Sequence, residues 1–263
     1  MSTPIEESPV LRPGLCSVTY RELTPAEVID LARDAGLECI EWAGDVHVPA
    51  GDVAGAASVR GATEAAGLAV ASYGSYLDFL GSEEEFALAA AGVVSAAEAL
   101  GAPRIRVWAG RTGSAEADSQ LRDTVVARIR HVADLTRPLG IDLGLEFHGH
   151  TLTDEVGSTL RLLEEVDRAN VLTYWQPHQG MPSADALSTL RRVLDRTSTI
   201  HAFSWWPMAE RLELAERADL WRGAVEILAA AGGDHDVLLE FVPDDDPSLL
   251  ASEAATLREW LHP

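Results

Sequence analysis

The chain alternates between short apolar runs of strand character and longer Ala-, Leu- and Glu-rich segments with helical periodicity. The apolar runs predict eight strands, at residues 14–19, 37–42, 68–73, 104–108, 142–147, 171–175, 199–203 and 237–242. The periodic segments predict eight helices, near residues 25–35, 54–66, 83–100, 117–138, 154–167, 183–195, 214–231 and 247–262. Thr24 and Pro25 are typical of a helix start, and Gly36 is typical of the end of that helix.

Repeated strand–helix units predict an α/β fold of parallel strands joined by right-handed crossovers. Eight units within 263 residues fit a single (β/α)8 TIM barrel, which takes about 250 residues, and leave no room for a second domain. We therefore expect a barrel domain over residues 13–263 and an N-terminal arm over residues 1–12. An open doubly wound sheet is the alternative, although no glycine-rich phosphate-binding motif follows any predicted strand.

The net charge of the chain argues against two classes of partner, nucleic acids and anionic membranes. The chain has 20 basic and 42 acidic residues, which gives a formal net charge of −22. Nucleic acids and anionic membrane surfaces attract basic proteins, so we expect neither to be a partner. A small molecule is the expected partner, because a single pocket can differ in charge from the rest of the surface.

The sequence shows no feature of a membrane protein or of an oxidising compartment. The first ten residues lack the basic flank and apolar core of a signal peptide, and no apolar run approaches the roughly 18 residues of a membrane span. Cys16 and Cys39 are too few for a disulfide framework, so we expect two buried free thiols. We expect a cytoplasmic protein.

Polar residues gather where the predicted strands end, and in a (β/α)8 barrel the active site lies at the carboxyl ends of the strands. In strand order these residues are Glu41, Trp42, Asp45 and His47; Tyr73 and Tyr76; Trp108 and Arg111; Glu146, His148 and His150; Gln176 and His178; His201 and Trp205; and Glu240. Five of the eight histidines are among them. A chance distribution would scatter these histidines over the helices and both ends of the barrel.

The last four strand ends together suit a metal site. A carboxylate within an apolar strand is costly unless it is paired or binds a metal. Glu146, His201 and Glu240 occupy equivalent strand-end positions, and Gln176 adds an amide oxygen. This set suits one divalent ion, namely manganese, cobalt, magnesium or zinc. Taken singly, each glutamate also has an ordinary explanation as part of an ion pair, and the histidine as a hydrogen-bonded core residue.

Five segments of the chain resemble the sugar phosphate isomerase/epimerase family, the xylose-isomerase-like TIM barrels. They are IEWAGDVHVPAGD (40–52), LGLEFHGHTLTDEVGSTLRLLEEV (143–166), VLTYWQPHQG (171–180), IHAFSWWP (200–207) and LLEFVPDDDPSLLASEAATLREWL (238–261). Their order and spacing carry the resemblance, which extends from about Gly14 to Leu261.

The resemblance implies a ligand set and a mechanism. The metal of the family is typically held by Glu, Asp, His and Glu from the last four strands, and Glu146, Gln176, His201 and Glu240 occupy these positions. Gln176 departs from the usual Asp and removes one negative charge, which predicts weaker metal binding or a different preferred ion. Glu146 and Glu240 would also form the catalytic acid–base pair, which moves a proton next to a carbonyl while the metal stabilises the enediolate.

Five further residues are candidate substrate contacts, namely His47, Trp108, His148, His178 and Arg211. They lie at or just after strand ends, where aromatic and imidazole rings can pack against a sugar. Arg211 resembles an arginine that meets the substrate in some family members. Apart from Arg106 and Arg111 it is the only candidate for a phosphate anchor, so we expect an unphosphorylated sugar or a related hydroxy-carbonyl compound.

The expected activity is a metal-dependent isomerase or epimerase of a sugar-like substrate in carbohydrate metabolism. The first alternative is a lyase of the inosose dehydratase, dehydroshikimate dehydratase or C-glycoside-cleaving type, in which His150 and His178 would supply the acid for a leaving group. A second alternative is an inactive binding homologue, which the replacement of the usual Asp by Gln176 suggests. A third is an endonuclease IV-like nuclease, which would need more metal ligands and a basic groove. The family resemblance also implies a possible homo-oligomer.

Overall fold

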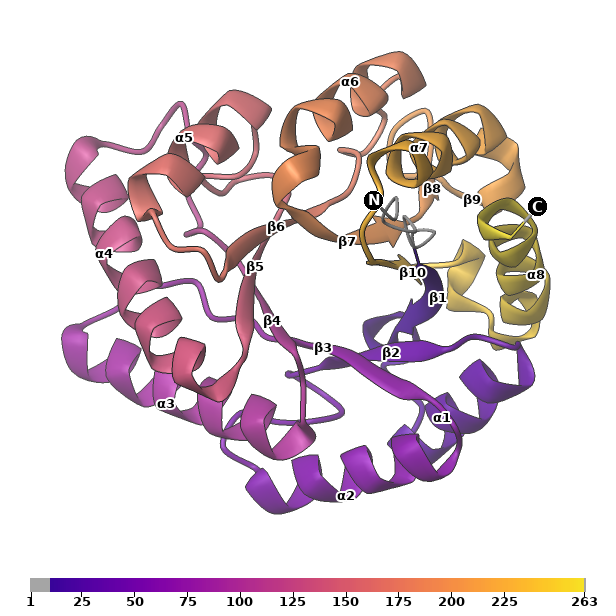
Figure 1. The fold of residues 1–263 in the computed structure, drawn as a ribbon, viewed down its shortest axis with the longest axis horizontal. Helices are drawn as coiled ribbons and strands as arrows, with labels where there is room; N and C mark the ends of the chain where they lie inside the picture. The colour runs from indigo at the N-terminus through magenta and orange to yellow at the C-terminus, as the bar shows by residue number, and fades with distance from the viewer. Residues whose placement is uncertain (1–9, 263) are drawn as a thin grey trace, which may run out of the picture.

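Eight parallel strands close into a barrel in the computed structural model of the protein, which describes residues 10–262 (Figure 1). The strands are β1 (Leu11–Cys16), β2 (Cys39–Ala43), β3 (Ala69–Gly74), β4 (Arg104–Val107), β5 (Asp142–Glu146), β6 (Val171–Trp175), β7 (Thr197–Ala202) and β10 (His235–Leu239). Each strand pairs with its neighbours in the chain, and β1 pairs with β10 to close the ring. This confirms the predicted fold and excludes the open doubly wound sheet.

Eight α-helices surround the barrel and cover its outer face (Figure 1). They are α1 (Pro25–Asp34), α2 (Val53–Ala65), α3 (Glu83–Leu100), α4 (Ser119–Thr136), α5 (Val156–Val166), α6 (Ser183–Val193), α7 (Ala218–Ala231) and α8 (Leu250–Leu261). Short 3-10 helices lie at Ser17–Tyr20, Arg137–Leu139, Leu194–Arg196, Leu214–Arg217, Pro243–Asp245 and Pro247–Leu249.

The start of α1 shows how the local sequence sets a helix boundary. The Thr24 hydroxyl accepts a hydrogen bond from the Glu27 amide (3.4 Å), and the Glu27 carboxylate accepts one from the Thr24 amide (2.7 Å). Pro25 occupies the first helical position, where its missing N–H costs nothing. This capping box confirms the helix start that the Thr-Pro pair predicts.

The first strand begins three residues earlier than its predicted start at residue 14. β1 covers Leu11–Cys16, so Leu11 and Arg12 belong to the barrel and not to the predicted N-terminal arm. Pro13, which cannot donate a ladder hydrogen bond, argues against a strand in the sequence, yet its carbonyl accepts from the Glu38 amide (2.9 Å). The rest of the predicted arm, residues 1–9, lies outside the described residues.

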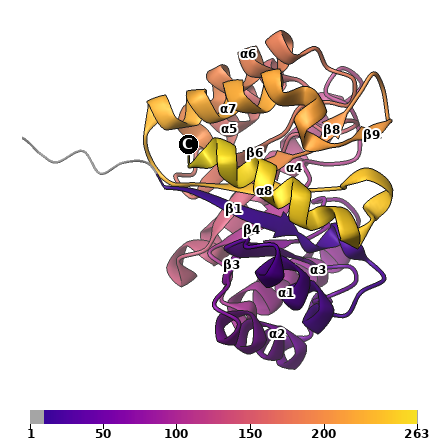
Figure 2. The ribbon, with the colours of Figure 1, turned by 90° about the vertical axis from the view of Figure 1, so that its right-hand side faces the viewer.

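A small antiparallel hairpin, β8 (Ser204–Trp205) with β9 (Arg211–Leu212), follows β7 and has no counterpart among the predicted strands. It projects at the end of the barrel toward which β1 runs (Figure 2). The hairpin therefore stands beside the carboxyl ends of the strands, where the candidate chemistry is expected. No helix within residues 10–262 has the length and apolar character to cross a membrane.

Candidate functional site

A cavity of about 300 Å³ opens at the carboxyl ends of the barrel strands. Its lining comprises Val18, Arg21, Tyr76, Arg106, Trp108, Glu146, His148, Gln176, Gln179, Phe203, Trp205, Glu240 and Phe241. The residues come from the ends of most of the strands and from the loops that follow them. The tertiary structure thus gathers strand-end residues that are up to about two hundred positions apart in the sequence, as expected for this fold.

Three of the four predicted metal ligands surround one ring nitrogen of the fourth, His201. The Nδ1 atom of His201 lies 3.0 Å from Gln176 Oε1, 3.7 Å from Glu240 Oε2 and 3.8 Å from Glu146 Oε1. The Gln176 amide nitrogen also donates to Glu146 Oε1 (3.1 Å). All four side chains are buried, His201 completely. The other three predicted ligands therefore surround His201 Nδ1 at 3.0–3.8 Å.

Two further charged residues, Glu41 and Arg106, complete the floor of the site. Arg106 Nη1 lies 3.2 Å from Glu146 Oε2, and Arg106 Nε lies 3.5 Å from Glu41 Oε1. The Ser72 hydroxyl donates to Glu41 Oε2 (2.6 Å). Arg106 alternates with Ile105 and Val107 in β4, and this period of two is the sequence signal that it points into the barrel. Sequence reasoning treated Arg106 only as a weak phosphate anchor, but its guanidinium is engaged by carboxylates.

The charges of this floor do not balance within the chain. Three buried carboxylates, Glu41, Glu146 and Glu240, face one guanidinium, which leaves an excess of two negative charges when His201 is neutral. Burial lowers the pKa of His201, but Glu240 and Glu41 outweigh it and raise that pKa to about 9. Burial raises the pKa of Glu240 to about 7 against the opposing charge of His201. Protons thus offset part of the negative charge.

A divalent cation fits this donor set. It would balance the excess of two negative charges in place of the bound protons. His201 could then be neutral, which is the form of histidine that binds metals. Carboxylate oxygens, an amide oxygen and an imidazole nitrogen are ligands that manganese, magnesium, cobalt or zinc accept. Glu146, Gln176, His201 and Glu240 are thus the residues that would hold the ion.

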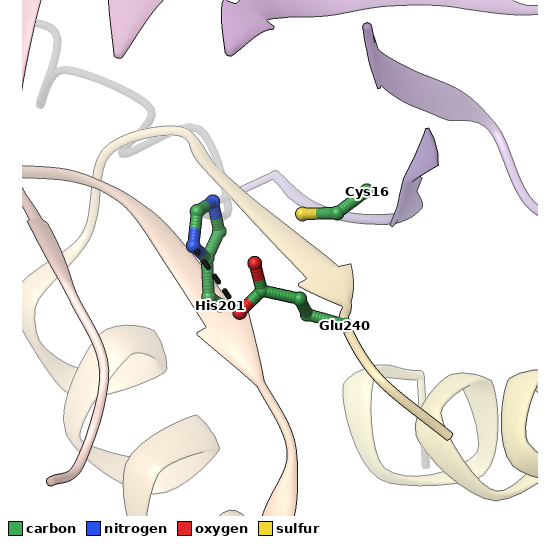
Figure 3. Close-up of side chains that lie close together, drawn as sticks. All are labelled: Cys16, His201 and Glu240. Carbon is green, nitrogen blue, oxygen red and sulfur yellow. Dashed lines mark ion pairs between the residues drawn. The ribbon is translucent and has the colours of Figure 1, made fainter. Parts of the chain in front are cut away.

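Cys16 lies against the same cluster. Its sulfur, one ring nitrogen of His201 and one carboxylate oxygen of Glu240 are all within 4.8 Å of one another, and Figure 3 shows the three side chains close together, with the ion pair between His201 and Glu240 dashed. Cys16 and Cys39 are both buried and free, which confirms the prediction of two buried thiols. Sequence reasoning gave Cys16 no role, since a strand assignment alone does not show which end of the barrel interior a thiol occupies.

Trp108 and His148 form one wall of the cavity. The Trp108 indole N–H donates to Glu146 Oε2 (2.7 Å), and the Trp108 and His148 rings stack with centroids 4.5 Å apart. Tyr76 meets the Trp108 ring edge-on at 5.3 Å. Trp108 therefore orients a predicted catalytic carboxylate in addition to lining the pocket, and the two predicted substrate contacts Trp108 and His148 both line the cavity.

The other predicted substrate contacts lie outside the lining of the main cavity. His47 is buried behind it, where its ring nitrogens contact Ser17 Oγ (2.9 Å) and the Leu23 carbonyl (3.0 Å). Arg211 pairs with Asp245 (2.6 Å). His178 and His150 line an adjoining hollow of about 290 Å³, which shares His148 and Gln176 with the main cavity.

Comparison with known proteins gives the same architecture. The family model described as a xylose isomerase-like TIM barrel matches residues 29–259. A 3-dehydroshikimate dehydratase from Bacillus anthracis is 38% identical over 94 residues, which are 34% of this chain and 33% of that protein. The match therefore spans about a third of that relative's length.

Solved structures match over nearly the whole chain. The probable 3-DHS dehydratase AsbF from Bacillus anthracis has a TM-score of 0.74 at 20% identity, covering 94% of this chain and 98% of its own. The 3-keto-D-glucoside 4-epimerase YcjR from E. coli has a TM-score of 0.74 at 16% identity, covering 95% and 99%. A xylose isomerase-like protein from Mycobacterium smegmatis in complex with magnesium has a TM-score of 0.71 at 17% identity, covering 95% and 96%. At these identities the structures show the shared fold, and the family model shows that the chain belongs to the xylose isomerase-like TIM barrel family.

Proposed function

We propose that the protein is a divalent-metal-dependent isomerase or epimerase of a sugar or sugar-like hydroxy-carbonyl compound. The observation that carries this proposal is the placement of Glu146 and Glu240. Their carboxylates come from separate strands of the barrel, line one cavity, and lie 3.8 and 3.7 Å from the same nitrogen of His201. Two carboxylates that face one bound substrate can remove a proton next to a carbonyl and return it.

The surrounding residues prepare Glu146 for this role. Both of its oxygens are oriented, since Gln176 donates to Oε1 (3.1 Å), whereas Trp108 donates to Oε2 (2.7 Å). Arg106 Nη1 stands 3.2 Å from Oε2 of the same carboxylate and holds it in place. Glu240, whose pKa burial raises to about 7, is the partner better suited to hold a proton at neutral pH. The bound cation would supply positive charge for the oxygens of the substrate.

The substrate in this proposal carries no phosphate. The two arginines that line the cavity each contact a carboxylate of the chain, Arg106 with Glu146 and Arg21 with Asp45. A phosphate ester would have to compete with these internal partners. Trp108 and the neighbouring His148 offer ring faces that suit the C–H surface of an unphosphorylated sugar.

A dehydratase is the second candidate, and the identity of 38% over 94 residues with a 3-dehydroshikimate dehydratase favours it. Elimination begins with the same proton abstraction but also needs an acid for the leaving group. His150 and His178 in the adjoining hollow are the residues proposed for that role. Both candidates share the metal site and the Glu146–Glu240 pair, so they differ in the product rather than in the first step.

Metal analysis and isotope exchange test the proposal together. Purified protein should carry about one equivalent of a divalent metal that is lost in Glu240→Ala. Metal-loaded protein in deuterated water should exchange the α-proton of a ketose, an inosose or 3-dehydroshikimate, and chelation should stop the exchange. Unchanged product mass indicates an isomerase or epimerase, and loss of water indicates a dehydratase.

An absence of both metal and exchange, after incubation with each ion, would contradict both candidates and would favour an inactive binding homologue. Manganese as the bound metal, a cytoplasmic location and a homo-oligomeric state stay predictions. Gel filtration of the purified protein checks the oligomeric state directly.

A further inference from the structure

A second aromatic wall lines the cavity, apart from the wall that Trp108 forms. Its members are Phe203 and Trp205, which follow β7, and Phe241, which follows β10. The Trp205 ring contacts both of the others, with centroids 5.4 Å from Phe203 and 5.6 Å from Phe241. Aromatic residues make up 6% of the chain, yet five of the thirteen residues that line this cavity are Phe, Tyr or Trp. This enrichment indicates that the cavity takes a ligand with apolar surface.

The topology of the barrel sets the two aromatic walls on opposite sides of the cavity. Tyr76, Trp108 and His148 follow β3, β4 and β5, which are consecutive in the ring of strands. The second wall follows β7 and β10, which are separated from that group by β6 on one side and by β1 and β2 on the other. The two sets of strands therefore lie across the ring from each other (Figure 1). A ligand in the cavity consequently has aromatic rings on two sides.

Arg211 supports the second wall from a position outside the cavity lining. Its guanidinium carbon lies 5.1 Å from the centre of the Trp205 ring and 4.8 Å from that of Phe241, and its Nη1 pairs with Asp245 (2.6 Å). Phe241 has a φ of 52°, which a bulky residue rarely adopts, and its amide donates to Thr19 Oγ1 (3.0 Å). Such a strained conformation persists only where the surroundings enforce it, and it is typical of ligand sites. The second wall is therefore formed before a ligand binds.

The polar groups beside the aromatic walls are mostly engaged within the chain. Arg21 donates to Asp45 and Tyr76, and Trp108 donates to Glu146. An open-chain polyol carries hydroxyl groups all along its length, and between two such walls it would lose hydrogen bonds to water without replacing them. A ring compound carries its polar groups around its edge and presents C–H groups on its two faces, which pack well against aromatic rings.

We propose that the substrate is a cyclic hydroxyketone, in which the carbonyl carbon belongs to a six-membered ring, and that this ring binds between the two aromatic walls with its edge toward the floor of the site. The proposal rests on the proposed function and narrows its substrate to preformed rings. The cavity volume of about 300 Å³ is at the small end for ligand pockets, which suits a single ring. Trp205 sets the preference for a ring, and Arg211 is a positioning residue that acts through the Trp205 and Phe241 rings.

α-Proton exchange in deuterated water compares the two classes of substrate. The cyclic probe is scyllo-inosose, and the open-chain probe is erythrulose, whose short chain cannot close a stable ring. With metal-loaded protein, kcat/KM for exchange should be at least about tenfold higher for scyllo-inosose, since apolar pockets discriminate by about 10–200-fold for even one methylene group. Exchange without protein is subtracted for each probe.

Two neighbouring tryptophans give a matched pair of variants. Trp205→Leu removes a ring from the second wall but keeps an apolar side chain, so it should lower the preference for scyllo-inosose about two- to tenfold, the range that one aromatic contact contributes. Trp206→Leu is the control, because Trp206 is the next residue, is 39% exposed and does not line the cavity. It should keep the preference of the parent protein.

Arg211→Met tests the positioning role with a separate readout. It should raise KM for scyllo-inosose and change kcat less, because the guanidinium touches the aromatic wall and does not line the cavity. A fall of kcat with KM unchanged would contradict this role. Should Trp205→Leu fail to fold, Arg211→Met and the two probes on the parent protein decide.

Binding of polyols separates a failure of this proposal from a failure of the proposed function. The probes are myo-inositol and sorbitol, which have equal numbers of carbon atoms and hydroxyl groups, but only myo-inositol is a ring, and neither has a carbonyl to react. Ligand-detected NMR should show binding of myo-inositol and weaker binding of sorbitol.

Exchange of erythrulose as fast as that of scyllo-inosose, or binding of sorbitol as tight as that of myo-inositol, would overturn the preference for rings and leave the proposed function intact. Preferential binding of myo-inositol without exchange of either ketone would contradict the proposed function and leave the ring-binding cavity. Neither binding nor exchange would contradict both.

Discussion

The two ends of the barrel interior hold similar residues in opposite charge balance. At the amino end, Asp236 pairs with Arg12 (2.7 Å) and Arg104, so one buried carboxylate faces two guanidinium groups. At the carboxyl end, three carboxylates face two basic groups, Arg106 and His201. At the amino end, residues of the chain neutralise the carboxylate. At the carboxyl end, the carboxylates carry more negative charge than the neighbouring basic groups balance. This difference indicates that an added cation would bind at the carboxyl end, because carboxylates outnumber basic groups there and not at the amino end.

The two buried cysteines differ in the same way, because each lies near one end of the barrel interior. Cys39 Sγ lies 3.8 Å from Asp236 Oδ1 and from the Pro13 carbonyl, among groups already engaged with one another. Cys16 lies beside His201 and Glu240, two of the candidate metal ligands. Burial raises the pKa of both thiols, so burial does not distinguish them. Their neighbours distinguish them, because Cys16 lies beside candidate metal ligands, whereas Cys39 lies beside a carboxylate that is paired with two arginines.

The largest expected effect comes from removing a carboxylate at the carboxyl end. Glu146→Gln and Glu240→Gln should each lower turnover by about 10²–10⁴-fold, the usual contribution of a positioned acid or base. Proton exchange in deuterated water measures it, and circular dichroism checks that the barrel remains. Asp236→Asn is the control at the other end and should keep its turnover. Retained turnover in either glutamine variant would remove that residue from the acid–base pair.

The same Asp236→Asn variant should instead lose stability. It leaves Arg12 and Arg104 without their shared carboxylate, and an unsatisfied charged group costs about 1–3 kcal/mol. The estimate belongs at the lower part of this range, because Arg12 is partly exposed. Urea denaturation measures the free energy of unfolding. A midpoint equal to that of the parent protein would mean that the amino-end ion pairs contribute nothing to stability.

Gln176→Asp adds a negative charge to the carboxyl end and so increases the difference in charge between the two ends of the barrel interior. We expect divalent-cation affinity to rise about tenfold, because ligand charge count tunes such sites over decades. Without metal the variant should unfold more easily, since an aspartate cannot donate to Glu146 as Gln176 does. Isothermal titration with Mn²⁺ after chelator treatment checks the affinity. Gln176→Glu, which adds the same charge on a side chain of the parent's length, is the matched comparison. Unchanged or weaker binding in Gln176→Asp would show that Gln176 is not a ligand.

The smallest effect is expected at His47, just outside the carboxyl-end cavity. His47→Gln removes one of the contacts with Ser17 and the Leu23 carbonyl, so it should cost about 1 kcal/mol in the free energy of unfolding. KM should change little, because the ring does not line the main cavity. Trp108→Phe, which removes a donor to Glu146, is the comparison and should lower kcat. A large rise of KM in His47→Gln would restore its predicted role in substrate binding.

Much of the fold follows from local pattern. Each of the eight predicted strands overlaps a barrel strand, and the helix starts at Thr24 and Ser82 are fixed by capping boxes that the sequence displays. The pattern fails where tertiary contacts outweigh local preference. β1 begins before Pro13 because pairing with β10 holds the segment extended, and the β8–β9 hairpin is too short to give a periodic signal.

The candidate site was predictable in outline. Because parallel strands in a barrel all end at one face, the residues after them must meet, and Glu146, His201 and Glu240 do so. Loop residues follow no such rule, since a loop can carry a side chain toward the cavity or away from it. His148 faces the main cavity, whereas His47 and Arg211 find partners beside it.

By itself, the sequence determined the alternation of strands and helices and the residue types at the strand ends, because both depend on neighbours in the chain. The tertiary structure decided the rest. Barrel register aligned Cys16 with Glu41 and placed Cys39 one layer lower, level with Gly14. Packing inserted Arg106 between two carboxylates and brought Gln176 into contact with both Glu146 and His201. These outcomes depend on atoms from distant strands, so no local pattern contains them.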